Sequence, residues 1–318
     1  MAARKLTVAL LAGGKSAERE VSLKSGEQVY QSLRKDLYEV RRYDPRDDLL
    51  RLAQDAPTID VALIILHGRL GEDGTIQGFL DALGIPYHGS KVLGSAVAMN
   101  KILTKRLYLE AGLPVSPSVV LDRSQPQGRH GEIDRLGFPV VVKPEHEGSS
   151  IGLSIVREPR ELQVALDKAF QYDRRCLVEK YLAGTEITAG VLGNDTLEAL
   201  PLVEIIPGDG YVFFDYEAKY TPGATREICP ARLSSELTEK AQDYAKRAHR
   251  ALCCRGYSRT DMIVSADGIY LLETNTIPGM TQTSLFPQAA AAAGISFSSL
   301  LDRLIELALE DAPAMLLN

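Results

Sequence analysis

The first hundred residues alternate short apolar runs with helical patterns, and this alternation limits the possible folds more than any other feature of the chain. The apolar runs have the length and the β-branched content of buried strands. Strands separated by helices predict a parallel sheet. The expected strands cover residues 6–11, 38–43 and 61–66, and the expected helices begin near Ser22, Asp47 and Thr75.

The rest of the chain predicts a mixed architecture in two or three domains, because 318 residues exceed one ordinary domain. A helical stretch over 95–111 stops at Gly112-Leu113-Pro114, which suggests a domain boundary. A small α+β unit follows, and then a long helix over 234–254 and a hairpin over 261–274. The strands of the α+β unit are expected at 118–121, 138–143, 153–156 and 176–180, with a helix at 159–170.

Charge and composition exclude several classes of protein. Lys and Arg number 36 against 42 Asp and Glu, and the resulting charge of -6 removes the electrostatic reason for binding nucleic acid. No stretch approaches the roughly 18 consecutive apolar residues of a membrane span, and the apolar start reads as a strand rather than a signal peptide. Four cysteines without CxxC spacing suit neither disulfides nor zinc. We therefore expect a cytoplasmic protein with no nucleic-acid or membrane partner.

Two loops leave the expected strands at the same edge of the parallel sheet, where open α/β folds bind ligands. They are GGKSAEREVS at 13–22 and HGRLGEDGTIQG at 67–78. The first loop also fits an ordinary turn in which Ser22 caps the helix and Glu18, Arg19 and Glu20 are solvated. Each loop alone is a weak signal, but two at one edge favour a site.

A second candidate region is rich in small residues. FPVVVKPEHEGSSIG places Lys143 at the end of an apolar strand, ahead of Gly and Ser residues whose backbone N–H groups can approach phosphate oxygens. A Gly/Ser-rich turn with a surface lysine is the alternative interpretation of this segment. LVEKYLAGTE at 177–186 fits either a hinge that reads an adenine edge, with Glu186 on the ribose, or an acidic turn.

The hairpin over 261–274 is the most informative feature. A three-residue turn at 266–268 would place Asp261 opposite Glu273, with Asn275 on the same face. Facing carboxylates destabilise a sheet unless a cation lies between them, and oxygen ligands without His or Cys suit Mg²⁺. A two-residue Asp-Gly turn would instead shift the register and put the carboxylates on opposite faces. The pattern alone leaves both turns open.

Taken in order, these segments resemble the D-alanine–D-alanine ligase family of the ATP-grasp superfamily. The resemblance extends from Gly13 to Pro287 and is highly specific, because many weak motifs match in order. It implies an α/β and α+β fold of three domains: an N-terminal parallel-sheet (pre-ATP-grasp) domain at 1–104, a central domain at 105–187 and a C-terminal domain at 188–318. The matching segments are GGKSAEREVSLKSG, LHGRLGEDGTIQG, MNK, VVKPEHEGSSIG, VEKYLAGTE, FFDYEAKY, YSRTDM and LLETNTIPGMTQTSLFP.

The resemblance also implies ATP, with Mg²⁺ or Mn²⁺, between the central and C-terminal domains. It supports the three-residue turn, since both hairpin carboxylates match metal ligands. It assigns the phosphates to Lys101, Lys143, Ser150 and Gly152, adenine and ribose to Glu179, Lys180, Leu182, Phe213 and Glu186, and the metal to Asp261, Glu273 and Asn275.

The same resemblance implies two D-alanine sites where the three domains meet. Glu18 matches the partner of the first ammonium group, with His67 beside it. Ser149 and Tyr220 match residues hydrogen-bonded to Glu18. The remaining matches are Arg259 and the Gly279 N–H for the oxyanion, Ser284 and Leu285 for the second carboxylate, and Lys219 near both phosphate and that carboxylate.

The implied activity is ligation of two D-alanine molecules through an acyl phosphate, for peptidoglycan precursor synthesis, by an enzyme expected to be a homodimer. A ligase that joins D-alanine to D-lactate is less expected, because relatives with that preference depart from the EAKY pattern, intact here at 217–220. A different ATP-grasp carboxylate–amine ligase and an inactive nucleotide-binding module are two further functions that we expect less. A closing lid is expected over 207–226.

Overall fold

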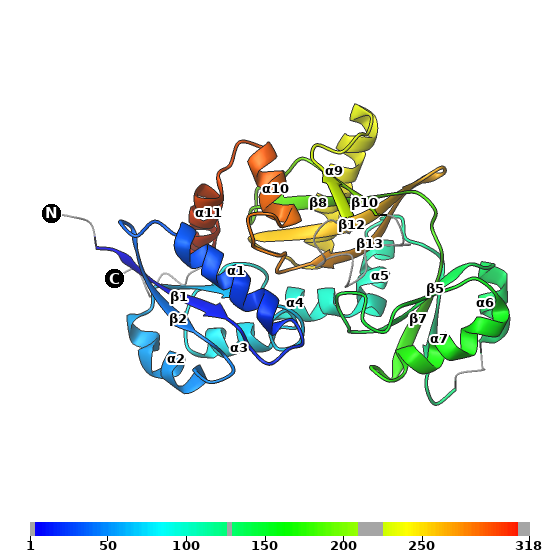
Figure 1. The fold of residues 1–318 in the computed structure, drawn as a ribbon, viewed down its shortest axis with the longest axis horizontal. Coiled ribbons are helices and arrows are strands. Elements are labelled where there is room, and N and C mark those ends of the chain that lie inside the picture. Colours follow the sequence, from blue (N-terminus) through cyan, green and yellow to red (C-terminus); the bar gives the residue numbers. More distant parts are fainter. Residues whose placement is uncertain (1–3, 126–128, 209–224, 311–318) are drawn as a thin grey trace.

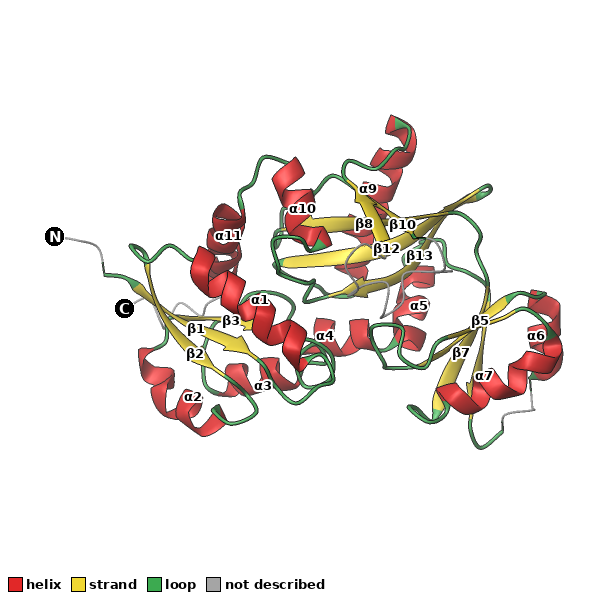
Figure 2. Ribbon diagram, in the orientation of Figure 1, coloured by secondary structure: helices red, strands yellow, loops and turns green. Residues whose placement is uncertain are grey.

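Three β-sheets divide the molecule into three lobes (Figure 1). The structure, a computed structural model, describes residues 4–125, 129–208 and 225–310. We call the lobes N-terminal, central and C-terminal after the three-, four- and six-stranded sheets that build them. Helices pack on each sheet, as Figure 2 shows. The domain boundaries at 104/105 and 187/188 stay predictions.

The N-terminal lobe contains the parallel sheet that the alternating pattern predicts. Its strands are β1 (Leu6–Ala12), β2 (Tyr38–Tyr43) and β3 (Val61–Ile65), and β1 lies between the other two. Every residue of β3 is buried, as expected for a parallel strand covered on both faces. The helices of this lobe are α1 (Arg19–Ser32), α2 (Leu49–Asp55) and α3 (Thr75–Ala82), with a 3-10 turn, η1 (Ala56–Thr58).

Helix α1 begins at Arg19, so the expectation that Ser22 caps it is wrong. The Ser22 hydroxyl is buried, accepts a hydrogen bond from the Gly13 N–H at 2.8 Å and donates to the Ile65 carbonyl. Ser22 therefore ties the first loop to the end of β3. Glu18 occupies the cap position and is buried, and Arg19 pairs with Asp44 at 2.7 Å, so neither residue is simply solvated.

The helical stretch expected over 95–111 is two helices, α4 (Val92–Met99) and α5 (Lys101–Glu110). Asn100 separates them with an extended backbone, and its side chain accepts a hydrogen bond from the Leu103 N–H, which caps α5. Helix α5 lies between the central and C-terminal lobes (Figure 1). Its Tyr108 is fully buried and lies 2.6 Å from the Thr274 hydroxyl of the C-terminal sheet.

The central lobe has its own core under an antiparallel sheet of order β4-β7-β5-β6. The predicted strands are all present, and a helix that the sequence did not predict, α6, lies beside them. The elements are β4 (Ser118–Asp122), α6 (His130–Leu136), β5 (Val140–Pro144), β6 (Ser154–Val156), η2 (Pro159–Glu161), α7 (Leu162–Ala169) and β7 (Arg175–Lys180).

The C-terminal lobe shares a hydrophobic core with the N-terminal sheet. Helix α11 returns to that sheet, where the Tyr38 hydroxyl donates to Asp302 at 2.8 Å. None of the described helices is long and apolar enough to cross a membrane. The elements are β8 (Thr185–Leu192), β9 (Glu198–Ala199), β10 (Val203–Pro207), β11 (Thr225–Ile228), α9 (Ser235–Ala251), β12 (Tyr257–Ser265), β13 (Gly268–Asn275), α10 (Leu285–Ala292) and α11 (Phe297–Glu310).

The β12–β13 hairpin places Asp261 opposite Glu273, as predicted. The prediction that a three-residue turn produces this pairing is wrong. Ser265 pairs with Gly268, so the turn has two residues. That register alone would put Asp261 opposite Leu272. A β-bulge between Asp261 and Met262 leaves Leu272 as an extra residue in β13 and restores the pairing of the two carboxylates.

Candidate active site

Two neighbouring cavities meet at the β12–β13 hairpin. The larger, which we call the large cleft, has a volume of about 920 Å³ and receives residues from all three lobes. The smaller, the inner cavity, lies between the central and C-terminal lobes. The large cleft is lined by the predicted substrate residues Glu18, His67, Ser149, Arg259, Gly279, Ser284 and Leu285. The inner cavity is lined by the predicted nucleotide residues Lys101, Lys143, Ser150, Glu179, Lys180, Leu182 and Glu186.

A hydrogen bond between lobes closes one end of the large cleft. The Ser149 hydroxyl donates to Glu18 Oε1 at 2.5 Å, across 131 residues of sequence. Ser149 and Ser150 both have positive φ, at 48° and 59°, a conformation that residues with a Cβ rarely adopt. The loop is therefore bent sharply where it meets the first loop of the N-terminal lobe. Tyr220 and Lys219 lie outside the described residues, as does most of the expected lid.

His67 and Glu72 form an acid–base pair in the wall of the large cleft. Nδ1 of the buried His67 lies 3.6 Å from Glu72 Oε1, and burial raises the pKa of Glu72. Nε2 of His67 is buried and has no hydrogen-bond partner within the described parts of the chain. The sequence did not single out Glu72, although it lies in the second loop.

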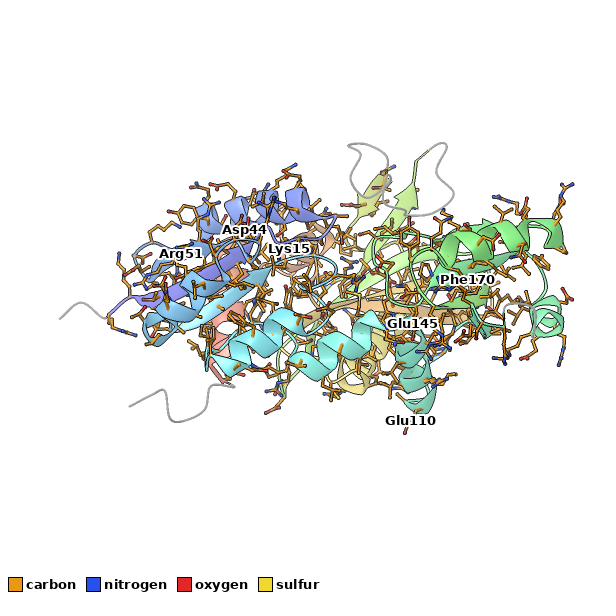
Figure 3. The ribbon with its side chains drawn as sticks, turned by 90° about the horizontal axis from the view of Figure 1, so that it is seen from below. Lys15, Asp44, Arg51, Glu110, Glu145 and Phe170 are labelled. Atoms are coloured by element: carbon orange, nitrogen blue, oxygen red, sulfur yellow. The ribbon has the colours of Figure 1, made fainter. Side chains whose placement is uncertain are left out.

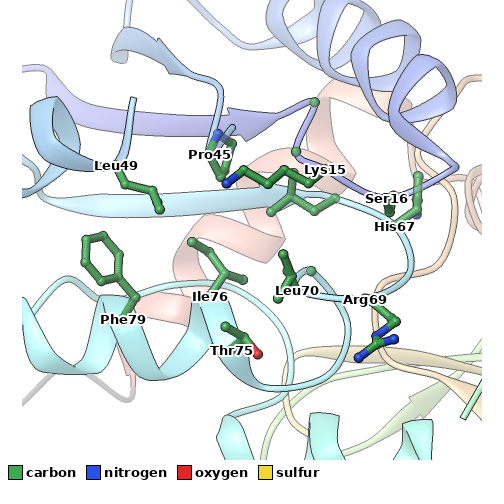
Figure 4. A pocket seen from close by; sticks show the side chains of 14 residues that line it. Lys15, Ser16, Pro45, Leu49, His67, Arg69, Leu70, Thr75, Ile76 and Phe79 are labelled. Carbon is green, nitrogen blue, oxygen red and sulfur yellow. The ribbon is translucent and has the colours of Figure 1, made fainter. Parts of the chain in front are cut away.

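A third pocket adjoins these two loops within the N-terminal lobe (Figure 4). Its walls are mostly apolar, with Ile76 and Phe79 from α3 and Leu49 from α2. Lys15 and Arg69 also line it, and both line a neighbouring pocket together with Glu18. None of the predicted nucleotide residues lines it.

Two lysines flank Glu179, and of these Lys143 lines the inner cavity whereas Lys105 does not. Lys105 pairs with one carboxylate oxygen and Lys143 with the other. Burial opposes ionisation of Glu179, but the charges of Lys143 and Lys105 outweigh it and lower its pKa to about 2. The sequence patterns did not single out Lys105, and the signal that could have found it was its position one helical turn after Lys101.

Lys101 holds the small-residue loop at the mouth of the inner cavity. Its ammonium group donates to the Glu147 carbonyl, and burial lowers its pKa. The start of α5 is fixed to the central lobe by Glu145 (Figure 3), whose carbonyl accepts from the Lys101 N–H at 3.0 Å and whose Oε1 accepts from Asn100 at 2.8 Å.

Gly152, predicted as part of the phosphate loop, does not line the inner cavity. Its φ is +74°, and a Cβ at this position would lie 2.6 Å from Pro144 Cγ. Packing within the central lobe therefore requires the glycine, whatever its distance from a ligand. Phe213 lies outside the described residues.

One face of the hairpin forms the wall between the two cavities. Arg259, Asp261, Glu273 and Asn275 share this face, because each is paired with another member of the set across β12 and β13. Asp261 and Glu273 line the inner cavity, whereas Arg259 and Asn275 line the large cleft.

Asp261 is the centre of a hydrogen-bond network. The Arg259 guanidinium pairs with both its oxygens at 3.0 Å, and Thr188 donates to Oδ1 at 2.6 Å. Asn275 Nδ2 lies 3.3 Å from Oδ2, which leaves the Asn275 amide oxygen as an acceptor. Among the residues that the structure describes, no three His, Cys, Asp or Glu side chains are grouped to hold a metal. The predicted metal ligands Asp261, Glu273 and Asn275 do not form such a group, because only two of them are carboxylates and Asn275 is an amide.

Known families and proteins match this chain over most of its length. The family models described as D-ala D-ala ligase N-terminus and D-ala D-ala ligase C-terminus match residues 41–90 and 107–306. The D-alanine--D-alanine ligase of Syntrophobacter fumaroxidans is 73% identical and covers 98% of this chain and 100% of its own length. That of Desulfotalea psychrophila is 56% identical and covers 97% and 96%.

Solved structures agree as well, and they confirm the expected three-domain ATP-grasp fold. The D-alanine--D-Alanine Ligase from Bacillus anthracis complexed with ATP has a TM-score of 0.85 at 36% identity and covers 96% of this chain and 98% of its own. The VanG D-Ala:D-Ser Ligase from Enterococcus faecalis has a TM-score of 0.85 at 32% identity and covers 96% and 100%.

Proposed function

This chain belongs to the D-alanine–D-alanine ligase family, and from that membership we propose that it joins two D-alanine molecules, with conversion of ATP to ADP and phosphate. The observation that carries the proposal is the hairpin wall, which puts two carboxylates against a lysine-lined cavity and an arginine against a cleft that three lobes share. The product is a precursor of peptidoglycan.

We assign ATP to the inner cavity. Lys101 and Lys143 supply positive charge for the phosphates, next to the loop that contains Ser150. Glu186 faces the same cavity and is assigned to the ribose. Glu179, Lys180 and Leu182 are assigned to adenine.

The hairpin face fits Mg²⁺ or Mn²⁺, because the carboxylates of Asp261 and Glu273 and the amide oxygen of Asn275 offer only oxygen ligands. When bound, the ion supplies positive charge that neutralises the phosphate oxygens during transfer. Asp261 is held for this task by Arg259 and Thr188, which fix its carboxylate plane.

We assign the first D-alanine to the end of the large cleft at Glu18. The Glu18 carboxylate, oriented by Ser149, accepts the ammonium group, and Nε2 of His67 offers a polar contact beside it. The carboxylate of this D-alanine then faces the inner cavity. It attacks the γ-phosphorus of ATP, the bond to the bridging oxygen breaks and ADP leaves, which yields an acyl phosphate.

The second D-alanine binds toward Ser284 at the start of α10. Its amine, once deprotonated, attacks the acyl carbon and forms a tetrahedral intermediate with an oxyanion. Arg259 and the Gly279 N–H are placed in the cleft to stabilise that charge. Collapse breaks the bond between carbon and the phosphate oxygen, releases phosphate and leaves the peptide bond.

The test of the function is phosphate release by the purified protein with ATP, Mg²⁺ and D-alanine, together with identification of the dipeptide. Because one structural relative is named as a D-Ala:D-Ser ligase, D-serine and D-lactate belong in parallel reactions as second substrates. Release of phosphate without dipeptide would contradict the proposal, and so would a product made mainly with D-lactate. No phosphate release would favour an inactive nucleotide-binding module.

Ser284→Ala should raise the KM for the second D-alanine about tenfold and leave the KM for ATP nearly unchanged. The Ser284 hydroxyl lines the large cleft and accepts a hydrogen bond from the Thr281 N–H at 3.1 Å. Its own O–H can donate to the incoming carboxylate, and the substitution removes that donor. Steady-state kinetics at saturating ATP measure the effect. Ser235→Ala, an exposed serine on α9, is the control. Equal increases in both KM values would instead indicate a general structural defect.

We further propose a cytoplasmic homodimer, on the basis of the family resemblance. Light scattering of the purified protein should give twice the mass of one chain, and the mass of a single chain would contradict this prediction.

A further inference from the structure

Lys105 is a buried charge that the proposed mechanism does not use. It extends from α5 toward β7 of the central lobe, and only 8% of it is exposed. A buried lysine is costly unless a carboxylate compensates it, and its partner is Glu179 on β7. Lys101 and Lys105 lie one helical turn apart, so α5 presents two cations on one face.

Two lysines, Lys105 and Lys143, share the single carboxylate of Glu179. Glu179 gives one oxygen to Lys105 and the other to Lys143, while Lys101 donates to the Glu147 carbonyl instead. If Lys143 were the only counter-ion of the buried Glu179, moving it toward a phosphate would leave that carboxylate uncompensated. With Lys105 in place, Glu179 keeps a partner when Lys143 moves.

We propose that Lys105 is a positioning residue, the permanent counter-ion of Glu179 that frees Lys143 to bind the nucleotide phosphates. The inference rests on the proposed ATP site. Lys105 itself contacts no substrate in this scheme and acts through Glu179. Its removal should therefore weaken binding of the phosphate groups more than binding of the nucleoside.

A double-mutant cycle on ADP binding tests this role. Lys105→Met should weaken ADP binding about tenfold, equivalent to about 1.4 kcal/mol, when Glu179 is present. In a Glu179→Gln background the same substitution should change ADP affinity by less than about threefold, because no carboxylate then competes for Lys143. Adenosine affinity should change little in either background. Titration calorimetry with ADP and with adenosine measures both effects.

Arg106→Met, at an exposed position on the same helix, is the matched control and should bind ADP as the unaltered protein does. An equal loss of ADP affinity in both backgrounds would show a structural role for Lys105 and overturn the inference, as would equal losses for ADP and adenosine. Should Lys105→Met fail to fold, the comparison of Glu179→Gln with the double variant still decides. Failure of the ligase assignment would be seen separately, as absence of dipeptide from the unaltered protein.

Discussion

Replacing Arg259 by lysine should lower kcat for dipeptide synthesis about a hundredfold or more, with little change in the KM for ATP. The guanidinium uses Nε and Nη2 to hold Asp261 and can direct its other N–H groups into the large cleft. A lysine is a single point charge without this fork, so it cannot keep both contacts. Because the oxyanion exists only in the transition state and the intermediate, the loss belongs mainly to kcat.

The control for this variant is Arg303→Lys, which keeps charge in a half-exposed pair with Glu198 that lines neither the inner cavity nor the large cleft. Thermal unfolding of both variants, followed by circular dichroism, separates a catalytic loss from a folding defect. An Arg259→Lys enzyme with kcat within about threefold of the original would exclude the oxyanion role.

Glu273→Gln should abolish turnover at ordinary Mg²⁺ concentrations while the protein remains folded. Glutamine preserves the shape of the side chain but removes the charge that faces the inner cavity. It also removes a like charge directly opposite Asp261, but with it the attraction of Glu273 to Lys101 and Lys143, so the metal-free protein should unfold at about the same temperature. Phosphate release over a range of Mg²⁺ concentrations, combined with differential scanning calorimetry, measures both effects.

Higher Mg²⁺ should restore part of the lost activity of this variant, because a weakened site fills only at a higher metal concentration. Glu239→Gln, an exposed position on α9, should have no effect on either measurement. Near-normal turnover of Glu273→Gln at ordinary Mg²⁺ would remove Glu273 from the metal site.

Elements with a strong local signal could be predicted from the sequence. Strands β1 and β3 each differ from prediction by one residue at one end, since apolar runs bounded by polar segments mark buried strands. Strand β2 has the predicted bounds, but it lies at the edge of its sheet and only Tyr38 and Tyr43 are buried, so the expectation that it is a buried strand is wrong. The broken helix at Asn100 was missed, because asparagine inside a helical pattern costs little by propensity alone. Only its side-chain bond to the Leu103 N–H shows that a new helix begins there.

Contacts across long sequence separations could not be predicted from local patterns. Nothing within the first loop indicates that Glu18 meets Ser149, and only the family resemblance brought the two together. The ion pair between Lys105 and Glu179 was missed for the same reason, since it joins a helix and a strand 74 residues apart. Packing between lobes determines these contacts, and periodicity carries no information about it.

The β-bulge at Leu272 has a consequence for how the hairpin tolerates changes of length. Between the bulge and the turn, the Leu271 N–H donates a hydrogen bond to the Pro114 carbonyl. The turn follows Ser265, so it lies several residues beyond the two carboxylates along the hairpin. A chain with one more residue in the turn and no bulge would pair Asp261 with Glu273 just as this one does. Insertions and deletions at the tip can therefore accumulate during evolution if the bulge is gained or lost with them. An insertion within β13 that kept both the two-residue turn and the bulge would instead shift the register by one residue and turn one carboxylate to the opposite face.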